Sequence, residues 1–319
     1  MSDDGLLSRI AEILYWSGRY VERADDTART LDVYVHHMLE DPDVDEDADC
    51  RALLDILSVP APEDGPMDIG MALSRLAYDP KSPSAIAGAI LAARAGLRSV
   101  RDVVSSEMWE CLNVTGLGLT SHRRSAERLG PHVYFRYVRE RAALFFGLAE
   151  STMSHDDAWR FLILGRSLER VDMTARLLLA RMSGSRHQLS WLTLLQACGA
   201  HESFIRTHGW ASEPSQVAEF LMLDRLFPRS VLHALSTAEQ CLLALDPEDE
   251  ARSGTGDPAR RPIGQLRMRL EYADPNQVEA ELPGLVSSLQ GACMEANEAI
   301  TKRYFSYAAP VAWAQEGLR

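Results

Sequence analysis

Two copies of one charged phrase carry the acids and bases in this chain whose spacing best suits joint chemistry. The first copy spans residues 18–31, the second spans residues 165–178, and both read G-R-x-x-E-R-x-D-x-T-A-R-x-L. Glutamate and arginine at this spacing either pair with each other or bind an anionic group, because a guanidinium fork fits a carboxylate or a phosphate. The candidate polar network comprises Arg19, Glu22, Arg23, Asp25, Arg29, Arg166, Glu169, Arg170, Asp172 and Arg176.

The spacing places the acids of each copy on one face of a helix. At about 100° per residue, the Gly, Glu, Asp and last Arg of the phrase form a narrow stripe, and the other two arginines line its flank. In the second copy, Met173 and Leu177 border this stripe where the first copy has Asp26 and Thr30. Buried charges must be paired, and a glycine permits close approach of another backbone. We therefore expect the stripe to face another helix or to line a cleft.

Ion pairing alone accounts for the phrase in two ways. Within one helix, acids and arginines spaced i, i+3 or i, i+4 contribute about 0.2–0.5 kcal/mol per exposed pair. Alternatively, the two stripes meet across a pseudo-twofold axis, so that the glutamate of one helix pairs with arginines of the other and fixes the register of the two halves. The intrahelical pairs predicted are Arg19–Glu22, Asp25–Arg29 and Asp172–Arg176.

Two functional interpretations stand beside these. Either the stripe binds a polar partner, or Glu22 or Glu169 acts as a general acid or base while the arginines hold an anionic substrate. The sequence carries no nucleophile signature and no metal-ligand set, which favours binding over catalysis. We expect no cofactor and no metal, because the acidic segment 41–49 has Glu46 where a calcium loop needs glycine, and Glu-x-x-His does not occur.

The repeat indicates an internal duplication in an all-α fold. Apolar residues recur with the helical period, and alternating strand patterns are nearly absent. We expect a helical bundle built from two duplicated halves with a pseudo-twofold relation, residues 1–150 and residues 151–319, which share one core. A second echo between the halves pairs Asp79, Pro83 and Ile86 with Asp224, Pro228 and Val231.

Helical periodicity and breaker residues locate further elements. Ser8 and Ser154 are the predicted N-caps of the two phrase helices. Further helices are expected at 91–113, 132–151, 189–206, 231–245 and 279–304, with loops at 40–49, 58–68, 182–187 and 246–264.

Composition limits the class of protein. The 319 residues carry a formal net charge of −13, which argues against nucleic acid or an anionic membrane as the partner. Five scattered cysteines without a C-x-x-C pair fit a reducing compartment. The polar start of the chain and the lack of a long apolar run predict neither a signal peptide nor a membrane span, and hence a cytoplasmic protein.

Several phrases in order resemble the Alpha-E family, a helical domain with an E-R motif. They are residues 7–24, 78–86, 152–166 and 224–231, and the motif itself corresponds to Glu22–Arg23 and Glu169–Arg170. Members of that family are encoded beside, or fused to, circularly permuted ATP-grasp ligase-like proteins and transglutaminase-like or protease-like proteins. The resemblance implies a part in an ATP-dependent system that forms peptide or amide bonds.

The sequence therefore leads to one main hypothesis and two alternatives. The main hypothesis is an accessory helical protein that binds an ATP-grasp ligase-like partner, a transglutaminase-like protein or the peptide substrate of such a system. The alternatives are an independent enzyme that uses Glu22 or Glu169, and an ion-pair network with a purely architectural role. The pattern leaves the oligomeric state open.

Overall fold

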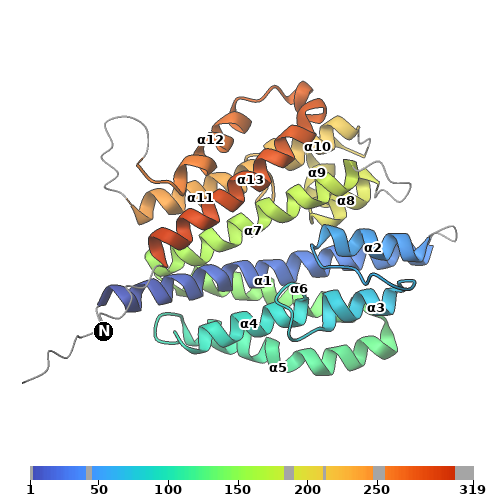
Figure 1. Cartoon of the computed structure of the whole chain (residues 1–319), viewed down its shortest axis with the longest axis horizontal. Helices are drawn as coiled ribbons and strands as arrows, with labels where there is room; N and C mark the ends of the chain where they lie inside the picture. Colours follow the sequence, from blue (N-terminus) through green and yellow to red (C-terminus); the bar gives the residue numbers. More distant parts are fainter. Residues whose placement is uncertain (1–2, 41–44, 183–189, 211–212, 247–255, 306–319) are drawn as a thin grey trace, which may run out of the picture.

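The computed structural model describes residues 3–40, 45–182, 190–210, 213–246 and 256–305, and every regular element in those ranges is a helix (Figure 1). The all-α prediction is confirmed. None of these helices combines the length and the apolar character that a bilayer crossing requires. The first helices are α1 (Asp3–Glu40), α2 (Glu46–Ile56), α3 (Ile69–Leu73) with a π-helical turn (Ser74–Tyr78), α4 (Ile86–Arg98), α5 (Ser106–Leu129) and α6 (His132–Thr152). The later ones are α7 (Asp157–Met182), α8 (Trp191–Ala197), α9 (His201–His208), α10 (Pro214–Leu223), α11 (Val231–Leu245), α12 (Arg260–Glu271) and α13 (Val278–Tyr304), the last preceded by a short 3₁₀ turn (Pro275–Gln277).

Two long helices, α1 and α7, pass through the centre of the molecule and run in the same direction (Figure 1). Helices α4 and α6 pack on α1, and α5 packs on both of them; α11 and α13 pack on α7, and α12 packs on both of those. The buried apolar side chains of the two parts form one continuous core. The order of packing is thus the same around each central helix, while the duplicated halves and the boundary at residue 151 stay predictions.

The two phrase glycines lie where α1 and α7 come closest. A methyl group added at Gly18 would lie 2.0 Å from the carbonyl oxygen of Leu162, and one added at Gly165 would lie 2.0 Å from the carbonyl oxygen of Tyr15. Each helix therefore touches the backbone of the other through a residue without a side chain. The contact is reciprocal, so both copies of the phrase need their glycine for the same reason.

Three of the further helices match the structure and two do not. The predictions at 132–151, 231–245 and 279–304 are confirmed as α6, α11 and α13. The single helix predicted at 91–113 is wrong, because α4 ends at Arg98 and the Ser105 side chain accepts a hydrogen bond from the Met108 N–H to begin α5. The helix predicted at 189–206 is also wrong, because Gly199 adopts a φ of +62° and separates α8 from α9; residue 189 lies outside the described ranges.

Several predicted ends also differ. Ser8 lies inside α1 rather than at its start. Asp156 caps α7 in place of Ser154, since its Oδ1 accepts from the Ala158 N–H at 3.0 Å. The loop at 58–68 is confirmed, whereas Glu40, residues 46–49, Met182 and residues 260–264 are helical. The remaining parts of the other loop predictions lie largely outside the described residues.

Replacing Gly18 or Gly165 by alanine should push α1 and α7 apart. Because the obstacle in each case is a backbone carbonyl, we expect each substitution to lower the free energy of unfolding by about 2 kcal/mol or more. Gly147→Ala is the matched control: it lies within α6, has open space around its Cβ position, and should raise stability by up to about 1 kcal/mol. Urea denaturation measures all three, and equal losses or no losses would contradict the tight crossing.

Candidate functional site

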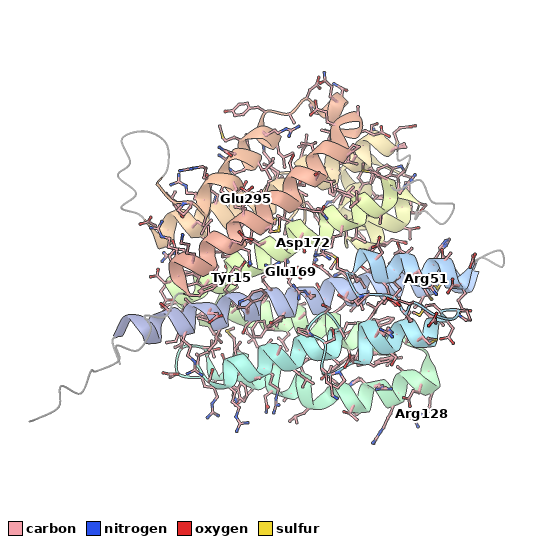
Figure 2. The ribbon with its side chains drawn as sticks, in the orientation of Figure 1. Tyr15, Arg51, Arg128, Glu169, Asp172 and Glu295 are labelled. Atoms are coloured by element: carbon pink, nitrogen blue, oxygen red, sulfur yellow. The ribbon has the colours of Figure 1, made fainter. Side chains whose placement is uncertain are left out.

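Just beyond the glycine contact, the glutamate of each phrase faces arginines of the other central helix. Glu169 on α7 accepts hydrogen bonds from two arginines of α1, near the centre of the view in Figure 2. Arg19 Nε donates to Glu169 Oε2 at 2.7 Å, and Arg23 Nη2 donates to the same oxygen at 3.1 Å, while Arg23 Nε donates to Oε1. The Glu169 side chain is only 2% exposed, so this ion pair lies inside the protein.

Glu22 on α1 makes the reciprocal set of contacts with α7. Arg170 Nε donates to Glu22 Oε1 at 2.6 Å, and Arg166 Nε donates to Oε2 at 3.2 Å. A third guanidinium, that of Arg229 in the turn before α11, lies 2.9 Å from Oε1. The Glu22 side chain is 1% exposed and is paired at both of its oxygens. Each glutamate of the E-R motif is thus neutralised by the arginines of the other central helix.

Further polar groups hold the arginines in place. Arg19 Nη1 donates to Asn297 Oδ1 of α13 at 3.0 Å and to the Tyr15 hydroxyl at 3.4 Å. The Tyr15 hydroxyl donates to the same Asn297 oxygen at 2.8 Å. On the other side, Arg170 Nη1 donates to the Pro228 carbonyl at 3.0 Å. The outer helices therefore fix the direction of guanidinium groups whose carboxylate partners lie between α1 and α7.

The arginines decide the protonation of both glutamates. Burial alone would raise the pKa of Glu169, but Arg23 and Arg19 outweigh it and hold that pKa at about 2. Burial likewise opposes ionisation of Glu22, yet its three arginines hold its pKa well below the ordinary 4.5. Burial, followed by the neighbouring positive charges, lowers the pKa of Arg170 to about 10 in spite of Glu22. Both glutamates are carboxylates at neutral pH, and their arginine partners are charged.

A cluster of three acids adjoins this centre. Carboxylate oxygens of Glu22, Asp25 and Asp26 lie within 4.8 Å of one another, a spacing compatible with a metal ion. The guanidinium of Arg229 instead contacts all three carboxylates. A tethered side chain therefore supplies the positive charge that burial of these acids requires.

Asp26 differs from the other acids of the cluster. Burial, opposed by Arg229 and reinforced by the nearby Glu22 and Asp25 carboxylates, raises the pKa of Asp26 to about 7. In the described part of the chain, Asp26 Oδ2 and Asp25 Oδ1 are buried and accept no hydrogen bond. The cluster therefore holds more acid than Arg229 fully satisfies, and a proton on Asp26 relieves the excess.

The ten residues of the predicted network fall into three groups. Arg19, Arg23 and Glu169 form the first. Glu22 joins Arg166, Arg170 and, through Arg229, the intrahelical pair Asp25–Arg29. The pair Asp172–Arg176 stands apart: Arg176 also donates to the Ser58 hydroxyl. Both i, i+4 pairs form, whereas Arg19 turns to Glu169 of the other helix in place of the predicted Glu22.

Sequence reasoning did not include Arg229, Tyr15 or Asn297 in the network. A signal for Arg229 exists in the places where the two copies differ. When the two copies of the phrase are aligned, Asp26 corresponds to Met173. In the second repeated pattern, which pairs Pro83 with Pro228, Arg229 corresponds to Ser84. The two positions at which the repeated patterns differ, Asp26 and Arg229, meet as an ion pair. No comparable pattern marks Tyr15 or Asn297.

The site offers charge pairing rather than a reactive group. All five cysteines are described and buried, and burial raises the pKa of Cys198 and Cys293, the two nearest the network, to about 12. A thiol with such a pKa is a poor nucleophile. Both motif glutamates are already ionised and saturated with donors. The arrangement defines a protein whose central helices are joined by buried Glu–Arg pairs.

Comparison with known proteins agrees with this description. The model of the Alpha-E family, described as a predicted alpha-helical domain with a conserved ER motif, matches residues 6–305. The chain belongs to the Alpha-E family. The Glu22–Arg23 and Glu169–Arg170 pairs on α1 and α7 are the two places where its sequence carries Glu-Arg within the phrase.

The similar proteins found are longer than this chain. Uncharacterized proteins of Mycobacterium bovis and Mycobacterium tuberculosis are 23% identical to it over 326 aligned positions. The alignment covers 92% of this chain but 36% of each relative, so the chain spans about a third of their length. No solved structure matches it significantly.

Replacing Glu169 by glutamine should destabilise the protein in a pH-dependent way. The variant leaves two arginines without their carboxylate, which costs about 3 kcal/mol near neutral pH. Because the folded pKa of Glu169 lies below its ordinary 4.5, its contribution is complete above that value and is lost as the pH falls towards 2. We expect the gap between wild type and variant to shrink over that acid range.

Chemical denaturation at a series of pH values measures this gap. Glu295→Gln serves as the control, since Glu295 is an exposed glutamate on α13, labelled in Figure 2. A gap for Glu169→Gln as small as that of the control would show that the buried pair does not stabilise the fold.

Asp26→Asn should have the opposite pH dependence. The folded pKa of Asp26, about 7, lies above the ordinary 3.8, so the folded state loses stability as the pH rises between these values. The asparagine variant lacks that loss. Its free energy of unfolding, relative to that of wild type, should therefore increase by roughly 1 kcal/mol or more from about pH 5 to about pH 8, and its relative melting temperature should rise with it. A relative stability that stays constant over this range, or falls, would refute the raised pKa.

Proposed function

We propose that this protein is a non-catalytic binding partner in an ATP-grasp-linked system that forms peptide or amide bonds. The observation that carries the proposal is the saturation of Glu22 and Glu169 by arginines from the opposite helix. Such a network joins α1 to α7 and leaves the outer helices to present surfaces to a partner. The link to ATP-grasp ligase-like proteins, and to transglutaminase-like proteins, comes from the genetic context of Alpha-E proteins.

The protonation states weigh against an independent acid–base enzyme. A general acid or base works best when its pKa lies near the working pH. Glu169 has its pKa held at about 2, and Glu22 is lowered as well. Neither group has a free oxygen directed at solvent, because both side chains are almost fully buried. The geometry supports a framework for binding better than it supports catalysis by these residues.

The relatives add a second line of support. The matched region forms 36% of each mycobacterial protein, so there the same domain is joined to further polypeptide. We infer that this domain acts together with other polypeptide of an ATP-grasp-linked system.

Affinity capture from the native cell extract, followed by mass spectrometry, tests the proposal. We expect the wild-type protein and Glu295→Gln to retain a protein with an ATP-grasp-type domain. The purified pair should then form an ATP-dependent amide product faster than the ligase-like protein alone.

The Glu22→Gln/Glu169→Gln variant tests whether the network only stabilises the fold or also contacts the partner. We expect its capture of the partner to fall in proportion to the unfolded fraction measured by circular dichroism. Loss of capture by fully folded variant protein would place the partner on the network itself. The absence of any ATP-grasp-type protein among those captured by wild type would overturn the proposed function.

A further inference from the structure

One face of α5 carries seven exposed residues that follow one another at steps of three and four positions. They are Glu107, Glu110, Val114, Leu117, Ser121, Arg124 and Arg128. Successive residues of a helix turn by about 100°, so the seven lie within an arc of about 100° and form a straight band along the helix. At about 1.5 Å per residue, this α5 band is about 30 Å long.

No other part of the described chain covers the α5 band. Helix α5 lies at the lower edge of the view in Figure 1 and packs on α4 and α6. Its opposite side supplies the buried residues Met108, Cys111, Leu112, Thr115, Leu119 and Ala126. Val114 and Leu117, in the middle of the band, are 54% and 66% exposed, and Arg128, labelled in Figure 2, points away from the molecule. The band is therefore a surface that another molecule can reach.

The charge of the α5 band changes sign along the helix. Glu107 and Glu110 lie near its start, Arg124 and Arg128 lie near its end, and the two aliphatic residues lie between them. Within the ranges that the structure describes, none of these four charged side chains forms an ion pair, whereas Arg123 and Glu127 beside the band pair with each other at 3.5 Å. The band thus holds two unpaired acids at one end and two unpaired bases at the other.

The helix dipole accounts for only part of this pattern. It favours acids in the first turn of a helix and bases in the last, which suits Glu107 and Arg128, but its effect fades beyond those turns. Arg124 and Arg128 stand at i, i+4, where like charges destabilise a helix that is exposed to water. Opposite charges from another molecule would remove this repulsion, and an apolar surface would cover Val114 and Leu117.

We propose that two copies of this chain associate through their α5 bands, antiparallel about a twofold axis at Val114 and Leu117. The aliphatic pair of one copy packs on that of the second copy. The two acids of each copy meet the two arginines of the other, so the same charge pairing occurs at both ends. A parallel pairing in register would set acids against acids and arginines against arginines.

The geometry sets the size and the strength of this assembly. A contact in which both copies use the same surface is closed, so it gives a dimer and no longer chain. One pair of helices with the neighbouring edges of α4 and α6 buries an area at the lower end of the range for specific interfaces. The dimer is therefore in equilibrium with the monomer and weakens as salt screens its charges.

Sedimentation equilibrium of the full chain over a range of concentrations tests the association. We expect the mass to rise towards that of a dimer as the concentration approaches about 100 μM, and the dissociation constant to increase with salt. A chain that stays monomeric up to that concentration would overturn the proposal and leave the band to a helix of another protein. Growth beyond a dimer would also overturn it.

Charge reversal tests the pairing of acids with arginines. Glu107→Arg/Glu110→Arg makes the band basic at both ends, and Arg124→Glu/Arg128→Glu makes it acidic at both ends. We expect each variant alone to raise the dissociation constant by about tenfold or more, because like charges then face each other. An equal mixture of the two should form a heterodimer, a recovery that misfolded variants would not show. Unchanged self-association of either variant, or no recovery in the mixture, would refute the charge pairing.

Chemical cross-linking locates the axis. The five native cysteines are buried, so a short bis-maleimide should react with a new thiol at Leu117→Cys. We expect this variant to form covalent dimers and the matched control Leu243→Cys to form none, since Leu243 is an exposed leucine on α11. Equal cross-linking of the two variants, or none at Leu117→Cys, would contradict the α5 contact.

Discussion

The backbone contact between α1 and α7 is the constraint on which the rest of the structure depends. Gly18 and Gly165 let two helices touch so closely that no side chain fits between them. The glutamates one turn further along are then enclosed by the opposite helix and removed from water. A carboxylate in that position is tolerated only with several donors, and the arginines at neighbouring positions of the phrase provide them. The glycine of the phrase thus permits the close crossing, the crossing buries the glutamate, and the arginines neutralise the buried glutamate.

The sequence predicts much of this arrangement, and the reasons for its failures are specific. The helical period of about 100° per residue is enough to place Glu22 and Glu169 on faces that meet another helix. It does not place Arg229 or Asn297, because these belong to turns and helices far along the chain whose position depends on tertiary packing. The helix boundaries at Ser105 and Gly199 depend on a side-chain cap and on a positive φ, respectively. The apolar residues continue with a helical period across both positions, so the period alone does not reveal these boundaries.

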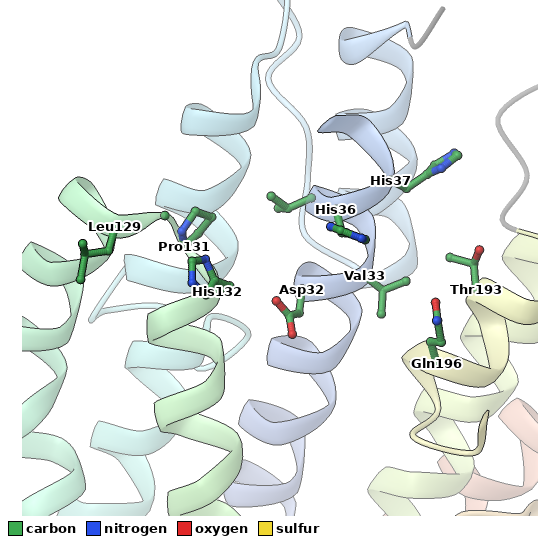
Figure 3. A pocket seen from close by; sticks show the side chains of 11 residues that line it. Asp32, Val33, His36, His37, Leu129, Pro131, His132, Thr193 and Gln196 are labelled. Atoms are coloured by element: carbon green, nitrogen blue, oxygen red, sulfur yellow. The ribbon is translucent and has the colours of Figure 1, made fainter. Parts of the chain in front are cut away.

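The length of α1 connects the network to a cavity at the C-terminal end of this helix, which is lined in part by Asp32, His36 and Gln196 (Figure 3). One unbroken helix of 38 residues carries Glu22 and, within four turns, Asp32 and His36. A methyl group at Gly199 would lie 3.0 Å from Arg29 Nη1, so the turn after α8 rests on the last arginine of the phrase. The network and the α8 wall of the cavity therefore both rest on the same helix.

The pair Asp26–Arg229 breaks the likeness of the two halves, and this has a consequence for assembly. If two first halves came together in the same crossing, Asp26 would face the position of Ser84 and would lack the positive charge that Arg229 supplies. Two second halves would set Arg229 against Met173. Only the combination of one predicted first half with one predicted second half balances these buried charges, so an association of two like halves from different copies in this crossing is disfavoured.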